Sequence, residues 1–175
     1  MSIGLWVRGA RPKTLVTSIA SVMVGAVMAY VHIERSGTCI AIYPEPASCA
    51  TAREQQTLLM DRFWPVTILC LLVALFLQIA VNYANDYSDG IRGTDAGRDM
   101  DESKSGKPQR LTASGLVPAK HVLFAAMICA AIACICGVVA VVLAQAWWLL
   151  AVGAASLLAG WFYTGGKHPY GYVGL

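Results

Sequence analysis

Residues 63–85 read FWPVTILCLLVALFLQIAVNYAN and contain no Asp, Glu, Lys or Arg. The hydrocarbon core of a bilayer is about 30 Å thick, and an α-helix of about 20 residues crosses it. These 23 uncharged residues therefore predict a transmembrane helix near 64–85. An acidic residue, Asp86, follows at once.

Two further stretches lack charged side chains, residues 14–33 and 121–166. They are 20 and 46 residues long, enough for one span and two spans. The pair Trp147 and Trp148 suits a lipid–water interface and divides the longer stretch. With 57% hydrophobic and 13% charged residues, the chain has too few polar side chains to cover a soluble globule. We therefore predict an all-α, polytopic transmembrane helical bundle with four helices, near 14–32, 64–85, 119–143 and 147–164.

The basic residues are distributed unevenly between the two sides of these helices. Ten of the thirteen Lys and Arg residues lie before the first helix, between the second and third, or after the fourth. Only Arg35, Arg53 and Arg62 lie in the loop 33–63. The positive-inside rule then places both chain ends and the loop 85–118 in the cytoplasm. We predict a multi-pass protein of the cell (inner, cytoplasmic) membrane, whose net charge of +3 reflects topology rather than nucleic-acid binding.

The exterior loop 33–63 contains glycine and proline and shows no clear period. This composition predicts an irregular connection, in which a short helix at 50–60 is an option. Cys39 and Cys49 share this loop. In an oxidising compartment a disulfide between them is one alternative and two separate thiols are the other, because spacing alone does not fix the geometry. The other four cysteines lie inside predicted spans and are interpreted as small apolar packing residues: Cys70, Cys129, Cys134 and Cys136.

The charged loop 85–118 is different in kind, because it begins directly at the end of an apolar helix. It opens as NDYSDGIRGTD. If the second helix continues through Asp89, then Asn82, Asp86 and Asp89 lie four and three residues apart, on one helix face. Charged groups at the membrane boundary are costly unless they serve an ion or a substrate. The spacing favours a functional site over the alternative, a solvated and self-neutralising linker.

Carboxylates held close together repel one another, and a divalent cation removes that repulsion. Oxygen ligands without Cys or His suit a hard ion, and one that shares its shell with phosphates is most simply Mg²⁺. The candidate metal ligands are Asn85, Asp86, Asp89 and Asp95. We therefore predict Mg²⁺ as the cofactor.

The same loop carries basic side chains, among them Lys107 and Arg110 within GKPQRLTASG, residues 106–115. Arginine binds phosphate oxygens bidentately, and lysine acts as a compact point charge. Acidic ligands for Mg²⁺ with cations nearby indicate a diphosphate-binding site. The Walker spacing of a nucleotide-binding loop is absent, which argues against an ATPase.

After the last helix the chain reads YTGGKHPYGYVGL, residues 163–175. Lys167 is a candidate cation for the diphosphate, and Tyr163 and Tyr170 are candidates for an aromatic substrate pocket. The alternative is a set of interfacial tyrosines with a lysine that extends to the headgroups, and spacing alone favours this alternative.

Four motifs together resemble the intramembrane aromatic prenyltransferases of the UbiA type. They are ARPKTL before the first helix, NDYSDGIRGTD, GKPQRLTASG and YTGGKHPYGYVGL, in that order. The Asp-rich motif is similar to that of the whole superfamily, whereas ARPKTL and the PYGYVGL ending resemble the branch that prenylates 1,4-dihydroxy-2-naphthoate in menaquinone biosynthesis.

The resemblance implies transfer of a polyprenyl group from its diphosphate to dihydroxynaphthoate at the lipid bilayer, giving demethylmenaquinone. It implies that Asp86 and Asp89 are catalytic and hold Mg²⁺-diphosphate together with Asn82 and Asn85, with Asp95 assisting. By the same resemblance the diphosphate contacts are Lys107, Arg110 and Lys167, and Arg11 lies near the aromatic acid.

Members of that family have more than four helices and a second Asp-rich motif in their later half, which this sequence does not contain. The expectation is therefore an N-terminal half that is inactive alone unless a complementary C-terminal half supplies the rest. Two alternatives stay open. One is a prenyltransferase for another aromatic acceptor, such as 4-hydroxybenzoate or homogentisate, and the other is a non-catalytic membrane protein that binds divalent ions.

Overall fold

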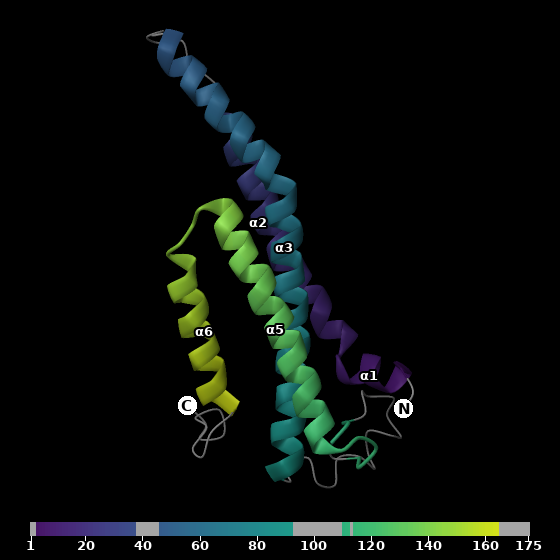
Figure 1. The fold of residues 1–175 in the computed structure, drawn as a ribbon. Helices are drawn as coiled ribbons and strands as arrows, with labels where there is room; N and C mark the ends of the chain where they lie inside the picture. The colour runs from purple at the N-terminus through teal and green to yellow at the C-terminus, as the bar shows by residue number, and fades with distance from the viewer. Residues whose placement is uncertain (1–2, 38–45, 93–109, 113, 165–175) are drawn as a thin grey trace.

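The computed structural model describes residues 3–37, 46–92, 110–112 and 114–164. Within these residues the structure is helical and contains no strand, which confirms the predicted all-α class (Figure 1). The helices are α1 (Ile3–Gly9), α2 (Pro12–Ser36), α3 (Pro46–Arg92), α5 (Ala119–Ala144) and α6 (Leu149–Thr164).

Three of these helices, α2, α3 and α5, are long and apolar enough to cross a membrane. Most of their outward side chains are exposed and hydrophobic, as a lipid-facing surface requires. The fourth expected span, α6, has 16 residues and is about 24 Å long, shorter than a bilayer core of about 30 Å. The chain is therefore a multi-pass membrane protein with three full-length spans and one shorter apolar helix among its described residues.

The helices run up and down, so that several of their ends meet at one end of the molecule (Figure 1). That end, called the loop end here, holds α1, the last turns of α3 and the first turn of α5. The final turn of α6 points the same way. The first described residues, the end of α3 and the end of α6 therefore lie toward one end of the molecule, and the side of the membrane that this end faces stays a prediction.

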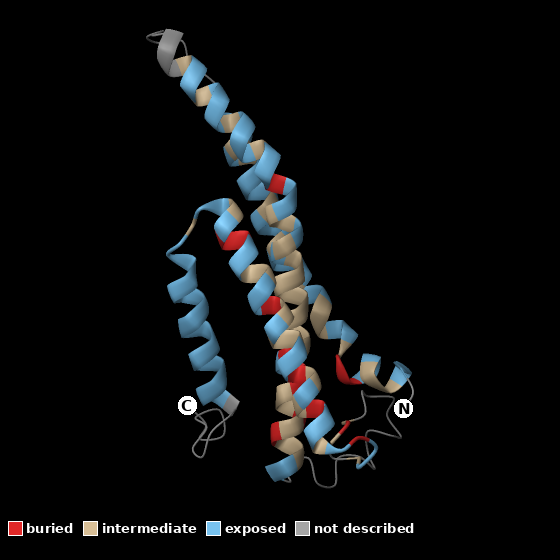
Figure 2. Cartoon of the chain, in the orientation of Figure 1, coloured by how far each residue is buried: buried red, intermediate tan, exposed pale blue. Residues whose placement is uncertain are grey.

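The buried core is concentrated at the loop end (Figure 2). Trp6 of α1 packs edge-to-face on Tyr83 of α3, with ring centroids 5.6 Å apart. The Tyr83 hydroxyl donates a hydrogen bond to the Trp6 carbonyl oxygen at 2.9 Å, which satisfies both polar groups. The core cluster joins four segments of the chain: Ala10, Tyr83, Leu111, Val117, Val122 and Ala126.

The structure differs from the sequence expectation over residues 33–63. α2 continues to Ser36 and α3 begins at Pro46, so most of the expected irregular loop is helical, and the short helix considered at 50–60 is part of α3. Ala, Arg, Glu, Gln, Leu and Met dominate this segment and favour helix, and Pro46 suits a first helical position. At 47 residues α3 is about 70 Å long, far longer than a bilayer core.

The extended parts of α2 and α3 contact each other beyond the apolar span. Gln56 Nε2 donates a hydrogen bond to the Glu34 carbonyl oxygen at 3.1 Å. Cys49 is disulfide-bonded, whereas Cys39 lies outside the described residues, so their pairing stays a prediction. The four cysteines in the predicted spans carry free thiols, and of the four expected packing residues Cys129 and Cys136 are partly buried whereas Cys70 and Cys134 are exposed.

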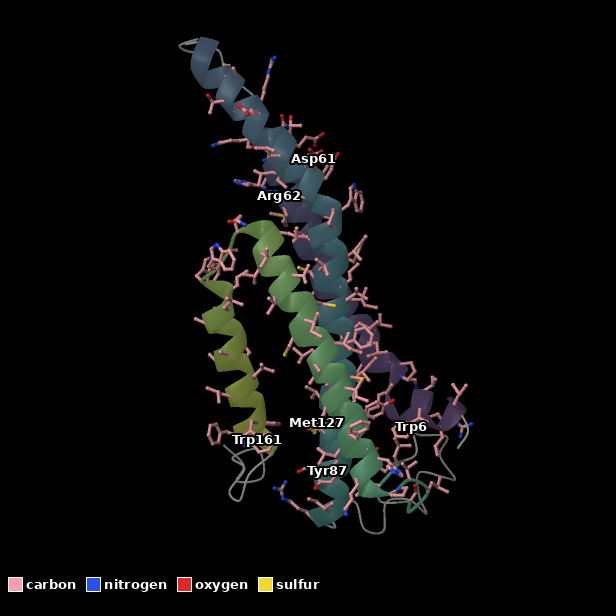
Figure 3. The ribbon with its side chains drawn as sticks, in the orientation of Figure 1. Trp6, Asp61, Arg62, Tyr87, Met127 and Trp161 are labelled. Carbon is pink, nitrogen blue, oxygen red and sulfur yellow. The ribbon has the colours of Figure 1, made fainter. Side chains whose placement is uncertain are left out.

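Arg62 fastens α3 to α5 at the end of the bundle opposite the loop end (Figure 3). Its Nη1 donates to the carbonyl oxygen of Leu143 at 3.2 Å, in the last turn of α5, where carbonyls lack a helical partner. A mainly apolar groove of about 410 Å³ lies beside this contact, between α2, α3 and α5.

Close packing at the loop end predicts that Gly9 does not tolerate a side chain. A Cβ at Gly9 would lie 2.5 Å from Cδ1 of Leu111, which is fully buried. We expect Gly9→Ala to lower the free energy of unfolding by about 1–3 kcal/mol, the usual cost of overpacking. Thermal unfolding in detergent micelles, followed by near-UV circular dichroism, measures this.

Gly25→Ala in α2 is the matched control, because no atom from a neighbouring segment lies within 4 Å of the position that a Cβ would occupy there. Relief of the glycine's helix penalty should raise stability by up to about 1 kcal/mol. Equal shifts of the same sign for both variants would contradict the close approach of α1 to Leu111.

Candidate functional site

The Asp-rich turns belong to α3, which continues through Arg92, so Asp89 is helical as the sequence interpretation required. Asn82, Asp86 and Asp89 consequently lie on one helix face. Asn82 is 4% exposed and Asp86 is 1% exposed. The Asp89 side chain, one turn further along, is 23% exposed. The face therefore runs from the buried core to an accessible end, near Tyr87 in Figure 3.

Asn82 fastens α3 to the junction between α1 and α2. Its Nδ2 donates to the Ala10 carbonyl oxygen at 2.8 Å and to Thr14 Oγ1 at 2.9 Å. Its Oδ1 accepts a hydrogen bond from Gln78 Nε2 at 3.3 Å. A buried amide needs such partners for both donors and acceptor, and here the protein itself supplies them.

Asp86 fastens α3 to the chain that precedes α5. Its Oδ2 accepts from the backbone N–H of Leu111 at 2.9 Å, and its Oδ1 accepts from the N–H of Thr112 at 3.0 Å. These hydrogen bonds bridge 25 and 26 positions of sequence. Hydrogen bonds to an ionised carboxylate are about twice as strong as neutral ones, so the contact fixes this segment firmly.

Arg110 precedes that fixed segment and reaches the next acidic residue on the helix. Its Nη1 lies 3.6 Å from Asp89 Oδ2. Both side chains are partly accessible, at 17% and 23% exposure. A cation and a carboxylate from separate segments therefore meet at the open end of the face.

Arg11, expected near the aromatic acid, forms the junction between α1 and α2. Its backbone is left-handed, with φ 53° and ψ 71°, which is uncommon for a residue with a side chain. Such strain persists only where surrounding contacts hold it, as the Asn82 hydrogen bond to Ala10 does here. One terminal guanidinium nitrogen of Arg11 is buried.

The sequence matches the UbiA prenyltransferase family over residues 57–175. The chain belongs to this family. It is 40% identical to 1,4-dihydroxy-2-naphthoate octaprenyltransferase of Mycobacterium tuberculosis over 173 residues, which are 99% of this chain and 47% of that protein. The protein of the same name from Escherichia coli is 29% identical over 97% of this chain and 46% of its own length. No solved structure matches the chain.

The UbiA-family chain thus spans about half the length of the relatives it matches. Several predicted site residues fall outside the residues that the structure describes: Asp95, Lys107, Lys167 and Tyr170. Tyr163 lies near the end of α6 and is 50% exposed. Its place in an aromatic pocket stays a prediction.

The donor types at the open end of the face fit a hard cation. Asn85 and Asp89 are four residues apart on α3 and offer an amide and a carboxylate oxygen. Within the described part of the chain, no group of three or more His, Cys, Asp or Glu side chains lies together as a metal site. The predicted ligand Asp95 lies beyond that part.

Sequence reasoning missed the groups that hold this UbiA-family site in place. They are the backbone amides of Leu111 and Thr112, the Ala10 carbonyl and the Thr14 hydroxyl. ARPKTL and GKPQRLTASG contain these residues, but the sequence pointed only to the basic side chains of GKPQRLTASG and to the likeness of both segments to family motifs. Every residue except proline has the same backbone groups, so the sequence does not show which of them form hydrogen bonds with α3.

Replacing Asn82 with its near-isosteric acid tests the contact with Ala10. In Asn82→Asp an acceptor replaces the donor that faces the Ala10 carbonyl oxygen. We expect the free energy of unfolding to drop by about 2 kcal/mol, because buried polar atoms lose their partners. Thermal unfolding in detergent measures it, and exposed Ser21→Ala is the control, expected near the parent. An unchanged melting temperature in Asn82→Asp would show that this contact does not stabilise the fold.

Proposed function

We propose that this chain is the N-terminal half of a prenyltransferase that joins a polyprenyl group to 1,4-dihydroxy-2-naphthoate in menaquinone biosynthesis. The 40% identity to the mycobacterial relative of that name, over almost the whole chain, supports the acceptor. The observation that carries the chemistry is the meeting of Asp89 and Arg110 at the end of a membrane-spanning helix. A complementary C-terminal half is part of the proposal, because the relatives are about twice as long.

Asp89 and Asn85 offer oxygen ligands, and Arg110 offers a guanidinium beside them. A diphosphate group needs both kinds of partner, a metal-binding oxygen cluster and cationic donors. The membrane position also suits the substrate, since a polyprenyl tail dissolves in lipid while its diphosphate stays at the polar boundary. In the proposed topology this loop end faces the cytoplasm, and the bilayer is the cell membrane.

In the proposed reaction the allylic C–O bond breaks, and its electron pair leaves with the diphosphate. The ring carbon of dihydroxynaphthoate that bears the carboxylate then forms the new C–C bond, and its bond to the carboxylate breaks, which releases CO₂ and returns the electron pair to the ring. Arg110 binds the diphosphate oxygens bidentately and stabilises their growing negative charge. Bound Mg²⁺ supplies Lewis-acid stabilisation of the same leaving group.

The remaining predicted residues take supporting parts in this proposal. Arg11 orients the carboxylate of the aromatic acid, and Tyr163 borders its ring. Asp95 adds a metal ligand. Three further side chains complete the substrate contacts: Lys107 and Lys167 on the diphosphate and Tyr170 on the acceptor.

The decisive variant is Asp89→Asn in a full-length chimera, in which residues 1–175 continue into the second half of the M. tuberculosis relative. Membranes containing the chimera receive dihydroxynaphthoate, polyprenyl diphosphate and Mg²⁺, and prenylated product is quantified by chromatography. We expect kcat/KM to fall by about 100-fold or more, because a group that stabilises the leaving diphosphate is weakened.

Asp61→Asn is the matched control, since Asp61 is an exposed carboxylate of the same helix far from the loop end (Figure 3). It should turn over like the parent chimera. Normal turnover of Asp89→Asn would refute the proposed site. If the parent chimera prenylates 4-hydroxybenzoate or homogentisate faster than dihydroxynaphthoate, the chain belongs to another branch of the family. If its affinity for Mg²⁺ does not increase when prenyl diphosphate is added, a non-catalytic ion-binding protein is favoured.

A further inference from the structure

We propose that Asp86 is a positioning residue that holds the 110–112 segment and thereby sets the Arg110 guanidinium beside Asp89. The inference rests on the proposed function, because the group that Arg110 is positioned to bind is a diphosphate. It assigns different roles to the two acidic residues of one motif, Asp86 and Asp89. Asp86 binds the protein's own backbone, and Asp89 with Asn85 faces the ligand.

The hydrogen bonds of Asp86 carry the first step. Each of its two carboxylate oxygens accepts one backbone N–H, from Leu111 at 2.9 Å and from Thr112 at 3.0 Å. Asp86 is 1% exposed, and burying its carboxyl group would be costly if its oxygens did not accept these hydrogen bonds. At 1% exposure the Asp86 oxygens are covered from a metal ion that carries phosphates, whereas the Asp89 side chain is 23% exposed.

Other contacts also hold the 110–112 segment that Asp86 binds. The segment therefore has one defined position. Leu111 is fully buried and approaches Gly9 of α1 closely. Its carbonyl oxygen accepts from the Val117 N–H at 3.3 Å, and the Arg110 carbonyl oxygen accepts from the Ser114 N–H at 3.2 Å. These contacts form a compact turn between α3 and α5.

This turn places the Arg110 side chain next to Asp89. Arg110 directly precedes the two anchored amides, and its Nη1 lies 3.6 Å from Asp89 Oδ2. Asp89 lies one helical turn beyond Asp86 on the same face of α3. The carboxylate that binds the segment and the carboxylate that contacts Arg110 are therefore neighbours along this helix. Loss of the anchor would leave Arg110 attached to the chain but free to leave Asp89.

Hydrogen exchange of the Leu111 and Thr112 amides tests the anchor without substrate or metal. The chain is studied in lipid nanodiscs as Asp86→Asn, in which one side-chain oxygen is replaced by an NH₂ group that cannot accept the second amide. We expect exchange of the peptide containing these amides to accelerate by about tenfold or more. Asp89→Asn is the control and should leave the exchange of both amides unchanged.

Kinetics of the full-length chimera test whether Asp86 acts through Arg110. The KM for polyprenyl diphosphate should rise in Asp86→Asn and in Arg110→Ala, and the double variant should be no worse than Arg110→Ala alone. Such non-additivity is the signature of residues that act as a unit. The Mg²⁺ concentration for half-maximal rate should rise in Asp89→Asn and stay at the parental value in Asp86→Asn.

Two results would overturn the inference. One is unchanged exchange of the Leu111 and Thr112 amides in Asp86→Asn. The other is a rise in the Mg²⁺ requirement of Asp86→Asn equal to that of Asp89→Asn, which would make Asp86 a metal ligand. If the parent chimera shows no Mg²⁺-dependent turnover, the proposed function fails, and the exchange measurement still decides separately whether Asp86 anchors the segment.

Discussion

The acceptance of two backbone amides by the buried carboxylate of Asp86 is the interaction that organises the loop end. It joins the last turns of α3 to the residues that lead into α5, across 25 positions of sequence. Leu111, held by this contact, fills the core against Gly9 and Tyr83. A carboxylate at that depth is unfavourable unless it is paired, so the contact must form whenever this end of the bundle is folded.

Asn82 makes the corresponding connection one helical turn earlier. It holds the α1–α2 junction through Ala10 and Thr14, so successive turns of α3 fasten two separate segments. Each segment carries an arginine next to its anchored residue, Arg11 in one and Arg110 in the other. The polar face of α3 therefore changes character along its length, from internal hydrogen bonds at Asn82 and Asp86 to an accessible carboxylate at Asp89.

The membrane explains why the spans were predictable and the region between two of them was not. In lipid every backbone polar group must be satisfied within the span, so an uncharged run of sufficient length has to be helical. Residues 46–62 mix charged and polar side chains with apolar ones, so that constraint does not apply to them. Their helix depends on propensity and on contacts such as Gln56 with the Glu34 carbonyl, which join parts of the chain that the sequence does not show to be neighbours.

The sequence by itself determined the all-α membrane architecture, the family motifs and the shared face of Asn82, Asp86 and Asp89, because hydrophobic length and helical periodicity are local properties. It assigned Asp86 and Asp89 the same role, as ligands of Mg²⁺-diphosphate, and placed Asn82 on the same diphosphate. Only the tertiary structure distinguished them, since their partners are backbone groups of distant segments and an arginine from beyond the loop. The burial of these residues and the identity of their partners are properties of the packed bundle. Packing brings together residues that are distant in the sequence, and the sequence alone does not show that they are in contact.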